Sequence, residues 1–176
     1  VINGTEFGIY FNNFYGFGLV DSAAAVSLAQ DISQDPMNWL PLGNQVETNA
    51  DLTNGVNISL AIPDAEKDGI THSQTVASNI NVESVQVNVQ ITHPRSGEIG
   101  IELTSPSGTK SILSNINNSF FLDTDSNLNI VLTSHAFYGE SSQGSWEIRI
   151  IDGKSGNTGT ITRWSLNILG HNYNNL

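Results

Sequence analysis

Two short acidic stretches have the residue types and spacing with which a loop can bind a calcium ion. They are DAEKDG at 64–69 and DTDSN at 123–127. Alternate oxygen ligands in a tight loop, with a glycine that permits the turn, are how an EF-hand calcium loop begins. The candidate ligands at alternate positions are Asp64, Glu66, Asp68, Asp123, Asp125 and Asn127.

Neither acidic stretch completes the calcium-loop pattern. The twelfth position of the first would be Thr75 rather than a bidentate glutamate, and the second has Leu128 where the glycine should stand. Neither stretch is flanked by helical patterns. Two hypotheses follow: calcium sites completed by ligands from elsewhere in the fold, or acidic turns exposed to solvent.

The chain contains no convincing set of catalytic residues. Its histidines have no metal-ligand spacing such as His-x-x-x-His, there is no G-x-S-x-G nucleophile elbow, and cysteine is absent. His93 closes a long strand pattern, and we expect it to be a hydrogen-bonded structural histidine. The other histidines are His72, His135 and His171.

Composition excludes several classes of partner. The chain has 176 residues, the size of one domain, and carries 6 Lys and Arg against 17 Asp and Glu, a net charge of -11. Such a surface repels phosphate backbones and anionic lipids, so we expect neither a nucleic acid nor a membrane partner. No apolar run approaches the roughly 20 residues of a membrane helix. The first residue is Val1, and we expect a mature or excised piece of a longer protein.

One helix is predicted near the start of the chain. Asp21 can cap a helical body over 22–32, because its carboxylate accepts hydrogen bonds from free amides of the first turn. The apolar stripe of this helix is narrow, so it needs a surface to lie on. It consists of Val20, Ala24, Leu28 and Ile32. Pro36 and Pro41 then indicate a linker in which Trp39 is an anchor.

From about residue 44 the hydrophobic period changes to two. In the stretch 80–93, Val85, Val87, Val89 and Ile91 share one face, which is typical of a half-buried antiparallel strand. Several further short strands are separated by turn signals such as SPSG at 105–108. This pattern predicts an all-β fold, a jelly-roll or galactose-binding-like β-sandwich.

Two tryptophans fall inside alternating strand patterns. Trp146 shares its face with Ile148 and Ile150, and Trp164 shares its face with Leu166 and Ile168. We therefore expect both to be core residues. An exposed aromatic row would instead be typical of a sugar-binding face.

Several ordered blocks together resemble the P domain, or Homo B domain, of kexin- and furin-like subtilases. HPRSGEIGIELTSPSGT (93–109) is similar to the family pattern H-x-x-x-G-D-L-x-I-x-L-x-S-P-x-G-T, with Glu98 and Ile99 in place of its Asp-Leu pair. The blocks IPDAEKDGI, FYGESSQGSWEIRIID and GTITRWSLNILG, at 62–70, 137–152 and 159–170, also match family patterns. The stretch FNNFYGFGLVDSAAAVSLA resembles the last helix of a subtilisin-type catalytic domain.

The resemblance implies a division of the chain and a role for it. Residues 1–33 would be the tail of the catalytic domain, 34–50 a linker, 51–170 the P domain and 171–176 a tail. The subtilase catalytic triad lies upstream of this helix in the family, and the G-T-S-x-A serine motif is absent here. The resemblance therefore implies a non-catalytic part of an extracellular serine endopeptidase. It would pack on the catalytic domain of the same protein and support its folding, stability and calcium dependence.

Two other functions stay open at the level of sequence. One is a carbohydrate- or surface-binding jelly-roll module, which would present Trp39, Trp146 and Trp164 as an exposed row. The other is an independent hydrolase.

Overall fold

The computed structural model describes residues 11–34, 45–49, 51–52, 55–117 and 127–172. Within these ranges the chain is mostly β-strand, with one α-helix and one short 3-10 helix. The helices are α1 (Ser22–Gln34) and η1 (Ser96–Glu98). The strands are β1 (Val46–Glu47), β2 (Val56–Ile62), β3 (Ile70–Val76), β4 (Ile80–Thr92), β5 (Ile99–Thr104), β6 (Lys110–Ser114), β7 (Asn127–Ser134), β8 (Gly144–Asp152) and β9 (Gly159–Asn172).

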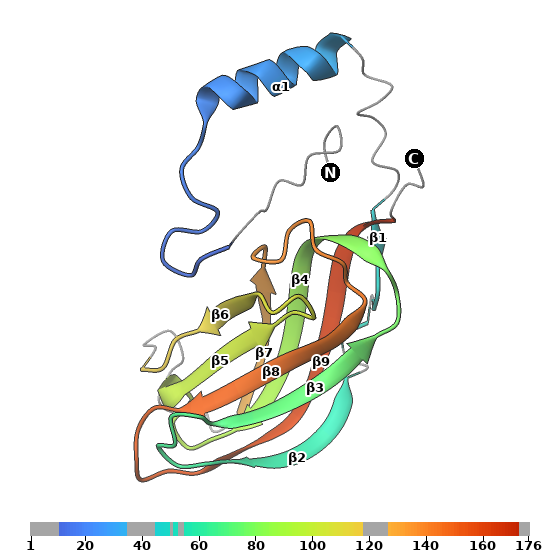
Figure 1. Ribbon diagram of the computed structural model, residues 1–176. Coiled ribbons are helices and arrows are strands. Elements are labelled where there is room, and N and C mark those ends of the chain that lie inside the picture. The colour runs from blue at the N-terminus through green and yellow to red at the C-terminus, as the bar shows by residue number, and fades with distance from the viewer. Residues whose placement is uncertain (1–10, 35–44, 50, 53–54, 118–126, 173–176) are drawn as a thin grey trace.

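The strands form two antiparallel sheets that face each other (Figure 1). One sheet has the order β1-β9-β4-β7, with β2 also paired to β9, and the other has the order β3-β8-β5-β6. The longest pairing joins β4 to β9, from Ile80 opposite Asn172 to Thr92 opposite Thr160. The all-β sandwich predicted from the alternating pattern is confirmed.

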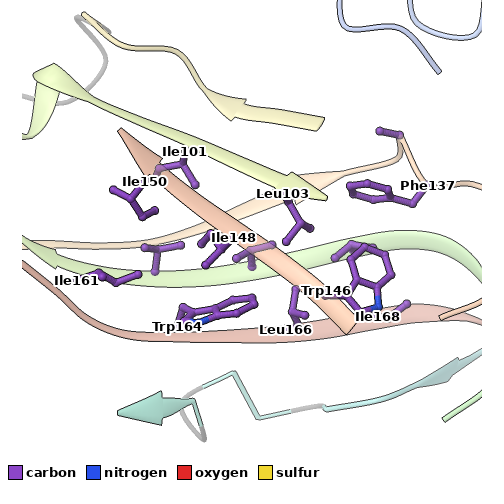
Figure 2. Close-up of a cluster of buried hydrophobic side chains, with 14 of the residues drawn as sticks. Ile101, Leu103, Phe137, Trp146, Ile148, Ile150, Ile161, Trp164, Leu166 and Ile168 are labelled. Carbon is purple, nitrogen blue, oxygen red and sulfur yellow. The ribbon is translucent and has the colours of Figure 1, made fainter. Parts of the chain in front are cut away.

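The core lies between the inner faces of the two sheets (Figure 2). Val85, Val87, Val89 and Ile91 all point into it from β4, as the period of two predicts. Trp146 and Trp164 are both fully buried, and Phe137 meets the ring of Trp146 edge to face at 5.0 Å. The prediction that both tryptophans are core residues is therefore confirmed.

Each buried tryptophan also has a partner for its indole N–H. Trp146 Nε1 donates to the Ser142 carbonyl at 2.8 Å, and Trp164 Nε1 donates to Nδ1 of His72 at 3.0 Å. A buried indole without such a partner would carry an unsatisfied donor, which is costly in an apolar core. Each of the two tryptophans is thus fixed by packing in the core and by one hydrogen bond.

Three of the connections between the sheets meet at one end of the sandwich. They are 63–69 between β2 and β3, 93–98 between β4 and β5, and 153–158 between β8 and β9. Hydrogen bonds from Gly153 to the Glu98 carbonyl and from Gly156 to Asp64 link the third connection to the other two. This end of the sandwich holds the polar cluster described below.

Helix α1 begins as the sequence predicts. The Asp21 carboxylate accepts a hydrogen bond from the Ala24 amide at 2.9 Å, which confirms the N-cap. The helix contains no buried residue, and in Figure 1 it stands away from the sandwich. Its packing surface is not supplied by the described residues. None of the described helices is long and apolar enough to cross a bilayer.

The sheet extends beyond the predicted domain bounds at both ends. Val46 and Glu47 were expected in the linker 34–50, but they pair with Gly170 and Leu169 of β9. Strand β9 likewise continues to Asn172, into the expected tail 171–176. The period of two expected from about residue 44 includes both residues, so the strand pattern agrees with the structure and only the domain bounds implied by the resemblance are too narrow. The predicted anchor Trp39 lies outside the described residues.

Replacing either buried tryptophan by alanine is expected to lower the free energy of unfolding by about 3–5 kcal/mol. The substitution leaves a large cavity and removes the donor that pairs with the hydrogen-bond acceptor of the indole. This loss is a large part of the roughly 5–15 kcal/mol that stabilises an ordinary domain. Thermal unfolding of Trp146→Ala and Trp164→Ala measures this. Tyr138→Ala, at a residue that is 51% exposed, is the control and should cost less than about 0.5 kcal/mol. Melting points of both tryptophan variants within a few degrees of the parent would contradict the assignment.

Candidate functional site

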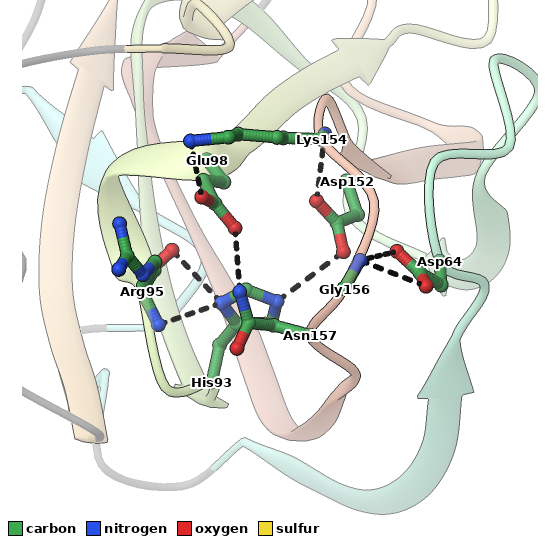
Figure 3. Close-up of polar contacts among 8 residues, drawn as sticks. All are labelled: Asp64, His93, Arg95, Glu98, Asp152, Lys154, Gly156 and Asn157. Carbon is green, nitrogen blue, oxygen red and sulfur yellow. Dashed lines mark hydrogen bonds and ion pairs between the residues drawn. The ribbon is translucent and has the colours of Figure 1, made fainter.

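The most unusual feature of the sandwich is a buried group of ionisable side chains at the end where the connections meet (Figure 3). His93, Glu98 and Asp152 are each at most 5% exposed, and their ligand atoms lie within 4.8 Å of one another. His93 directly follows β4, Glu98 directly precedes β5, and Asp152 ends β8. Two strands of one sheet and one of the other are thus joined by three side chains.

His93 is held on both sides of its ring. Its Nε2 lies 3.3 Å from Oδ2 of Asp152, and both side chains are fully buried. Its Nδ1 faces the backbone of Arg95, 2.8 Å from the carbonyl oxygen and 3.0 Å from the amide nitrogen. The expectation of a hydrogen-bonded structural histidine agrees with this geometry.

The first residue of β9 completes the packing around His93. A side chain at Gly159 would place its Cβ 2.5 Å from Cδ2 of His93 and 2.8 Å from the Thr92 carbonyl. Both distances are shorter than any normal contact, so only glycine fits beside the imidazole. The start of β9 therefore packs directly against the imidazole ring.

Every carboxylate oxygen of the cluster has a partner. Glu98 Oε1 lies 3.6 Å from Nζ of Lys154, and its Oε2 accepts from Nδ2 of Asn157 at 3.3 Å. Asp152 Oδ1 accepts from the Lys154 amide at 3.1 Å, while its Oδ2 faces His93. Buried carboxylates without partners would be strongly destabilising. The cluster therefore fixes the loop 153–158 by offering it acceptors, and the loop supplies the donors that the carboxylates need.

The cluster does not have the geometry of a hydrolase site. A Ser-His-Asp triad needs a hydroxyl nucleophile on the histidine nitrogen opposite the carboxylate. In this chain that nitrogen, Nδ1 of His93, faces the Arg95 backbone. The His93 and Asp152 side chains are also sealed from solvent, so a substrate could not reach them.

The cluster is a poor metal site for a related reason. Histidine and carboxylates are suitable ligands, but here each carboxylate oxygen is already paired with Lys154, Asn157 or His93. A divalent cation would have to displace these donors and lie beside an ammonium group. The arrangement is that of a closed structural network.

The other histidines are also tied to neighbouring groups. His72 accepts from Trp164, and Nδ1 of His135 lies 3.2 Å from the Glu83 carbonyl oxygen. His171 Nδ1 lies 2.8 Å from Oε1 of Glu83. Among the described residues, no second group of three potential ligands converges as the cluster does.

The acidic residues predicted as calcium ligands lie elsewhere. Asp64, Glu66 and Asp68 are exposed in the connection 63–69, and their carboxylates do not converge on one another. Asp64 instead accepts the Gly156 amide with both carboxylate oxygens, each at 3.1 Å. The first acidic stretch therefore fits a calcium site poorly with its own ligands.

Of the second acidic stretch, only Asn127 lies within the described residues. Asp123 and Asp125 lie outside the described residues. Asn127 begins β7, where its side-chain oxygen accepts from the Thr92 hydroxyl at 3.0 Å. Calcium binding by either stretch stays a prediction.

Sequence reasoning missed the polar cluster itself. The signal was present in the ordered blocks: one begins with His93, another ends with Asp152, and a third begins with Gly159. Because these residues are up to 66 positions apart, from 93 to 159, nothing in the local pattern showed that they meet. The replacement of the usual Asp-Leu pair by Glu98-Ile99 keeps a carboxylate that reaches across to Lys154 and Asn157.

Comparison with known proteins places this geometry in a family. The model of the proprotein convertase P-domain family matches residues 82–168, which span β4 to β9 and include the whole cluster around His93. The extracellular serine protease of Aeromonas sobria is 30% identical over 95% of this chain. Human neuroendocrine convertase 2 is 26% identical over 93% of it.

Solved structures agree with the sequence comparison. The crystal structure of the Aeromonas sobria serine protease in complex with its chaperone superposes with a TM-score of 0.76, at 29% identity over 94% of this chain. The chain spans about a third of these relatives: 31% of the Aeromonas protease sequence, 25% of the human convertase and 32% of the crystallised chain. The similarity thus covers only one part of each of these longer proteins.

The matched blocks, the two-sheet topology and the superposition all agree. The chain belongs to the P-domain family of subtilisin/kexin-like serine proteases, and its sandwich is the non-catalytic P domain of that family.

Proposed function

We propose that the chain is part of a longer, secreted subtilisin/kexin-like serine endopeptidase, in which it supports the folding and stability of the catalytic domain. The observation that carries this proposal is the sealed cluster of His93, Glu98 and Asp152. It is built to hold strands together and leaves no reactive group open to a substrate. Residues 1–33 would then belong to the catalytic domain, followed by the linker and the P domain.

The physical basis of such support is mass action. A module that binds only the folded form of a neighbouring domain shifts its folding equilibrium toward the native state. A covalent linker raises the effective concentration of the module to the millimolar range, so even a weak contact stabilises. The exposed helix α1 is consistent with this role, because it has no buried residue and lacks a packing surface among the described residues.

The carbohydrate-binding alternative is not favoured. It required tryptophans in an exposed row, and Trp146 and Trp164 are instead fully buried with their indole N–H groups paired inside the protein. The independent hydrolase has no support in the geometry around His93.

Secretion is part of the proposal. The Aeromonas sobria relative is an extracellular serine protease. The net charge of -11 favours solubility, and the core contains no disulfide because the chain has no cysteine. Both properties are compatible with an extracellular protein. We extend the extracellular location of the relative to this protein.

Calcium dependence is a separate element of the proposal. Its basis is the net charge and the six candidate ligands at 64–68 and 123–127, whereas the exposed carboxylates of the first stretch do not converge. Any calcium site using Asp68 or Glu66 would need oxygens from outside that stretch, because calcium takes about 6–8 of them.

The role is tested by comparing the full-length protease with a version that ends before the sandwich. We expect the 176-residue chain alone to show no peptidase activity on fluorogenic peptides, since the family triad lies in the catalytic domain.

The truncated protease should unfold at a lower temperature or fail to accumulate, and adding the chain in trans should restore part of the loss. Equal stability of the two proteases, or serine-inhibitor-sensitive turnover by the purified chain, would refute the proposal.

Calcium dependence is tested by the melting temperature in chelator and in millimolar calcium. Binding to the native state alone adds about 2.7 kcal/mol at a hundredfold excess over the dissociation constant, so the melting point should rise with calcium. Asp68→Asn should blunt this rise. Asp64→Asn is a less clean variant, because Asp64 also holds the Gly156 amide and its loss destabilises the loop without any metal. A melting temperature that calcium does not move would leave both stretches as acidic turns.

A further inference from the structure

The turn that precedes helix α1 is attached to the edge of the four-stranded sheet by one side chain. Asn13 Nδ2 donates to the Lys110 carbonyl at 3.0 Å, and Asn13 Oδ1 accepts from the Ile112 amide at 2.9 Å. Strand β6 is the outermost strand of its sheet, so these two groups point away from β5. The amide of Asn13 satisfies them as the peptide group of another strand would.

The turn that presents Asn13 is internally braced. Asn12 and Gly16 exchange two backbone hydrogen bonds at 2.8 and 2.7 Å, and the Asn12 side chain accepts from the Phe14 amide at 2.8 Å. Gly16 has a φ of 61°, which suits glycine at this point of a tight turn. The ring of Phe11 packs against the sandwich core and meets Phe17 edge to face at 5.4 Å. Asn13 is therefore held in place by the hydrogen bonds within the turn and by the packing of Phe11 on the sandwich.

The outer side of this turn and of the residues between it and α1 is strongly apolar. Phe14 is 91% exposed and Leu19 is fully exposed, and Tyr15 and Val20 are also largely open to solvent. On the sandwich, Ile112 beside Asn13 is 39% exposed although it lies on a strand. Soluble proteins seldom leave so many large apolar groups together without a partner. The turn thus has one side on β6 and another side that lacks a partner among the described residues.

We propose that the β6 edge is the surface through which the sandwich meets the catalytic domain of the same protein, and that the turn 11–17, which belongs to the segment 1–33 assigned to that domain, makes the first contact of this junction. This inference rests on the proposed function, because it assumes that a catalytic domain precedes the sandwich. Asn13 is the positioning residue of the junction, since it fixes the turn, and therefore the start of α1, relative to the sheet. The opposite edge of the sandwich, where β2 pairs with β9, is left free of this contact.

The catalytic domain is the expected occupant of this surface because of the segment to which the turn is joined. The docked turn runs directly into α1, which resembles the last helix of a subtilisin-type catalytic domain. The relatives are about three times as long as this chain, so a large remainder is available to cover the apolar side. The apolar side of the turn is continuous along the chain with this helix, so it is the surface that we assign to that remainder.

The absence of cysteine makes the surface testable by thiol labelling. Ile112→Cys places a thiol on the β6 edge, and Val56→Cys places one at a similarly exposed valine, 47% open, on the opposite edge. Reaction rates with a maleimide are compared between the 176-residue chain and the full-length protease. We expect the Ile112→Cys variant to react at least tenfold more slowly in the full-length protein, and the Val56→Cys variant to react equally in both.

Each other outcome overturns the surface. Equal reactivity of the Ile112→Cys variant in both proteins, or slowing of the Val56→Cys variant instead, would place the junction elsewhere. Protection of Ile112→Cys that appears in the short chain and grows with its concentration would identify a second copy as the occupant. If the sandwich stabilises the protease in the truncation experiment while Ile112→Cys stays reactive, the proposed function stands and only the surface is wrong.

The positioning role of Asn13 has its own readout. In Asn13→Ala the Ile112 amide loses its acceptor, so its hydrogen exchange should accelerate at least tenfold while that of Ile148 in β8 is unchanged. Asn13→Asp keeps an acceptor for Ile112 but sets a carboxylate against the Lys110 carbonyl, and it should give a smaller acceleration. In the full-length protein, Asn13→Ala should restore part of the reactivity of Ile112→Cys. Unchanged exchange at Ile112 in both Asn13 variants would overturn the positioning role.

Discussion

The constraint on which the sandwich depends most is the burial of two carboxylates where three inter-sheet connections meet. Glu98 and Asp152 lie in the interior at strand ends, and a buried carboxylate is tolerated only when donors surround it. Those donors come from His93 in the connection 93–98 and from Lys154 and Asn157 in the connection 153–158. The cluster can therefore form only when β4, β5, β8 and β9 are all in place, and this couples the two sheets at that end.

The apolar core and the polar cluster have different roles. The alternating side chains of β4, β8 and β9, with Trp146 and Trp164, supply the buried apolar area that drives the sheets together. The apolar core determines which faces of the sheets meet. The hydrogen bonds of the polar cluster depend on direction, and each buried polar group needs a partner, so they determine how the strand ends are arranged. A domain whose role is to offer a fixed surface to a neighbour needs both. In the proposed junction, the Asn13 contact on β6 would pass this fixed geometry to the turn that precedes α1.

Much of the fold was predictable from local pattern. The period of two identified the strands around Val85 and both buried tryptophans, and Asp21 marked the start of α1, because burial of one face and capping of free amides are local requirements. The short strand at Val46 lies inside the stretch whose period of two begins near residue 44, but the domain bounds assigned it to the linker, because two residues alone do not mark a strand. The cluster around His93 was missed because its members meet only through the topology. The acidic stretch at Asp64 was interpreted by composition, whereas in the structure its first carboxylate accepts a backbone amide from the loop after β8.

The measurement that tests the central claim most directly is amide hydrogen exchange in the loop 153–158. If the buried carboxylates hold this loop, the amides of Gly153 and Lys154, which donate to the Glu98 carbonyl and to Asp152, should be protected nearly as well as those of the β4 strand. The amides of the exposed residues Glu66 and Lys67 in the connection 63–69 provide the comparison within the same chain. Exchange of Gly153 and Lys154 at the rate of an unstructured peptide would show that the cluster does not fix the connections, and the account would fail.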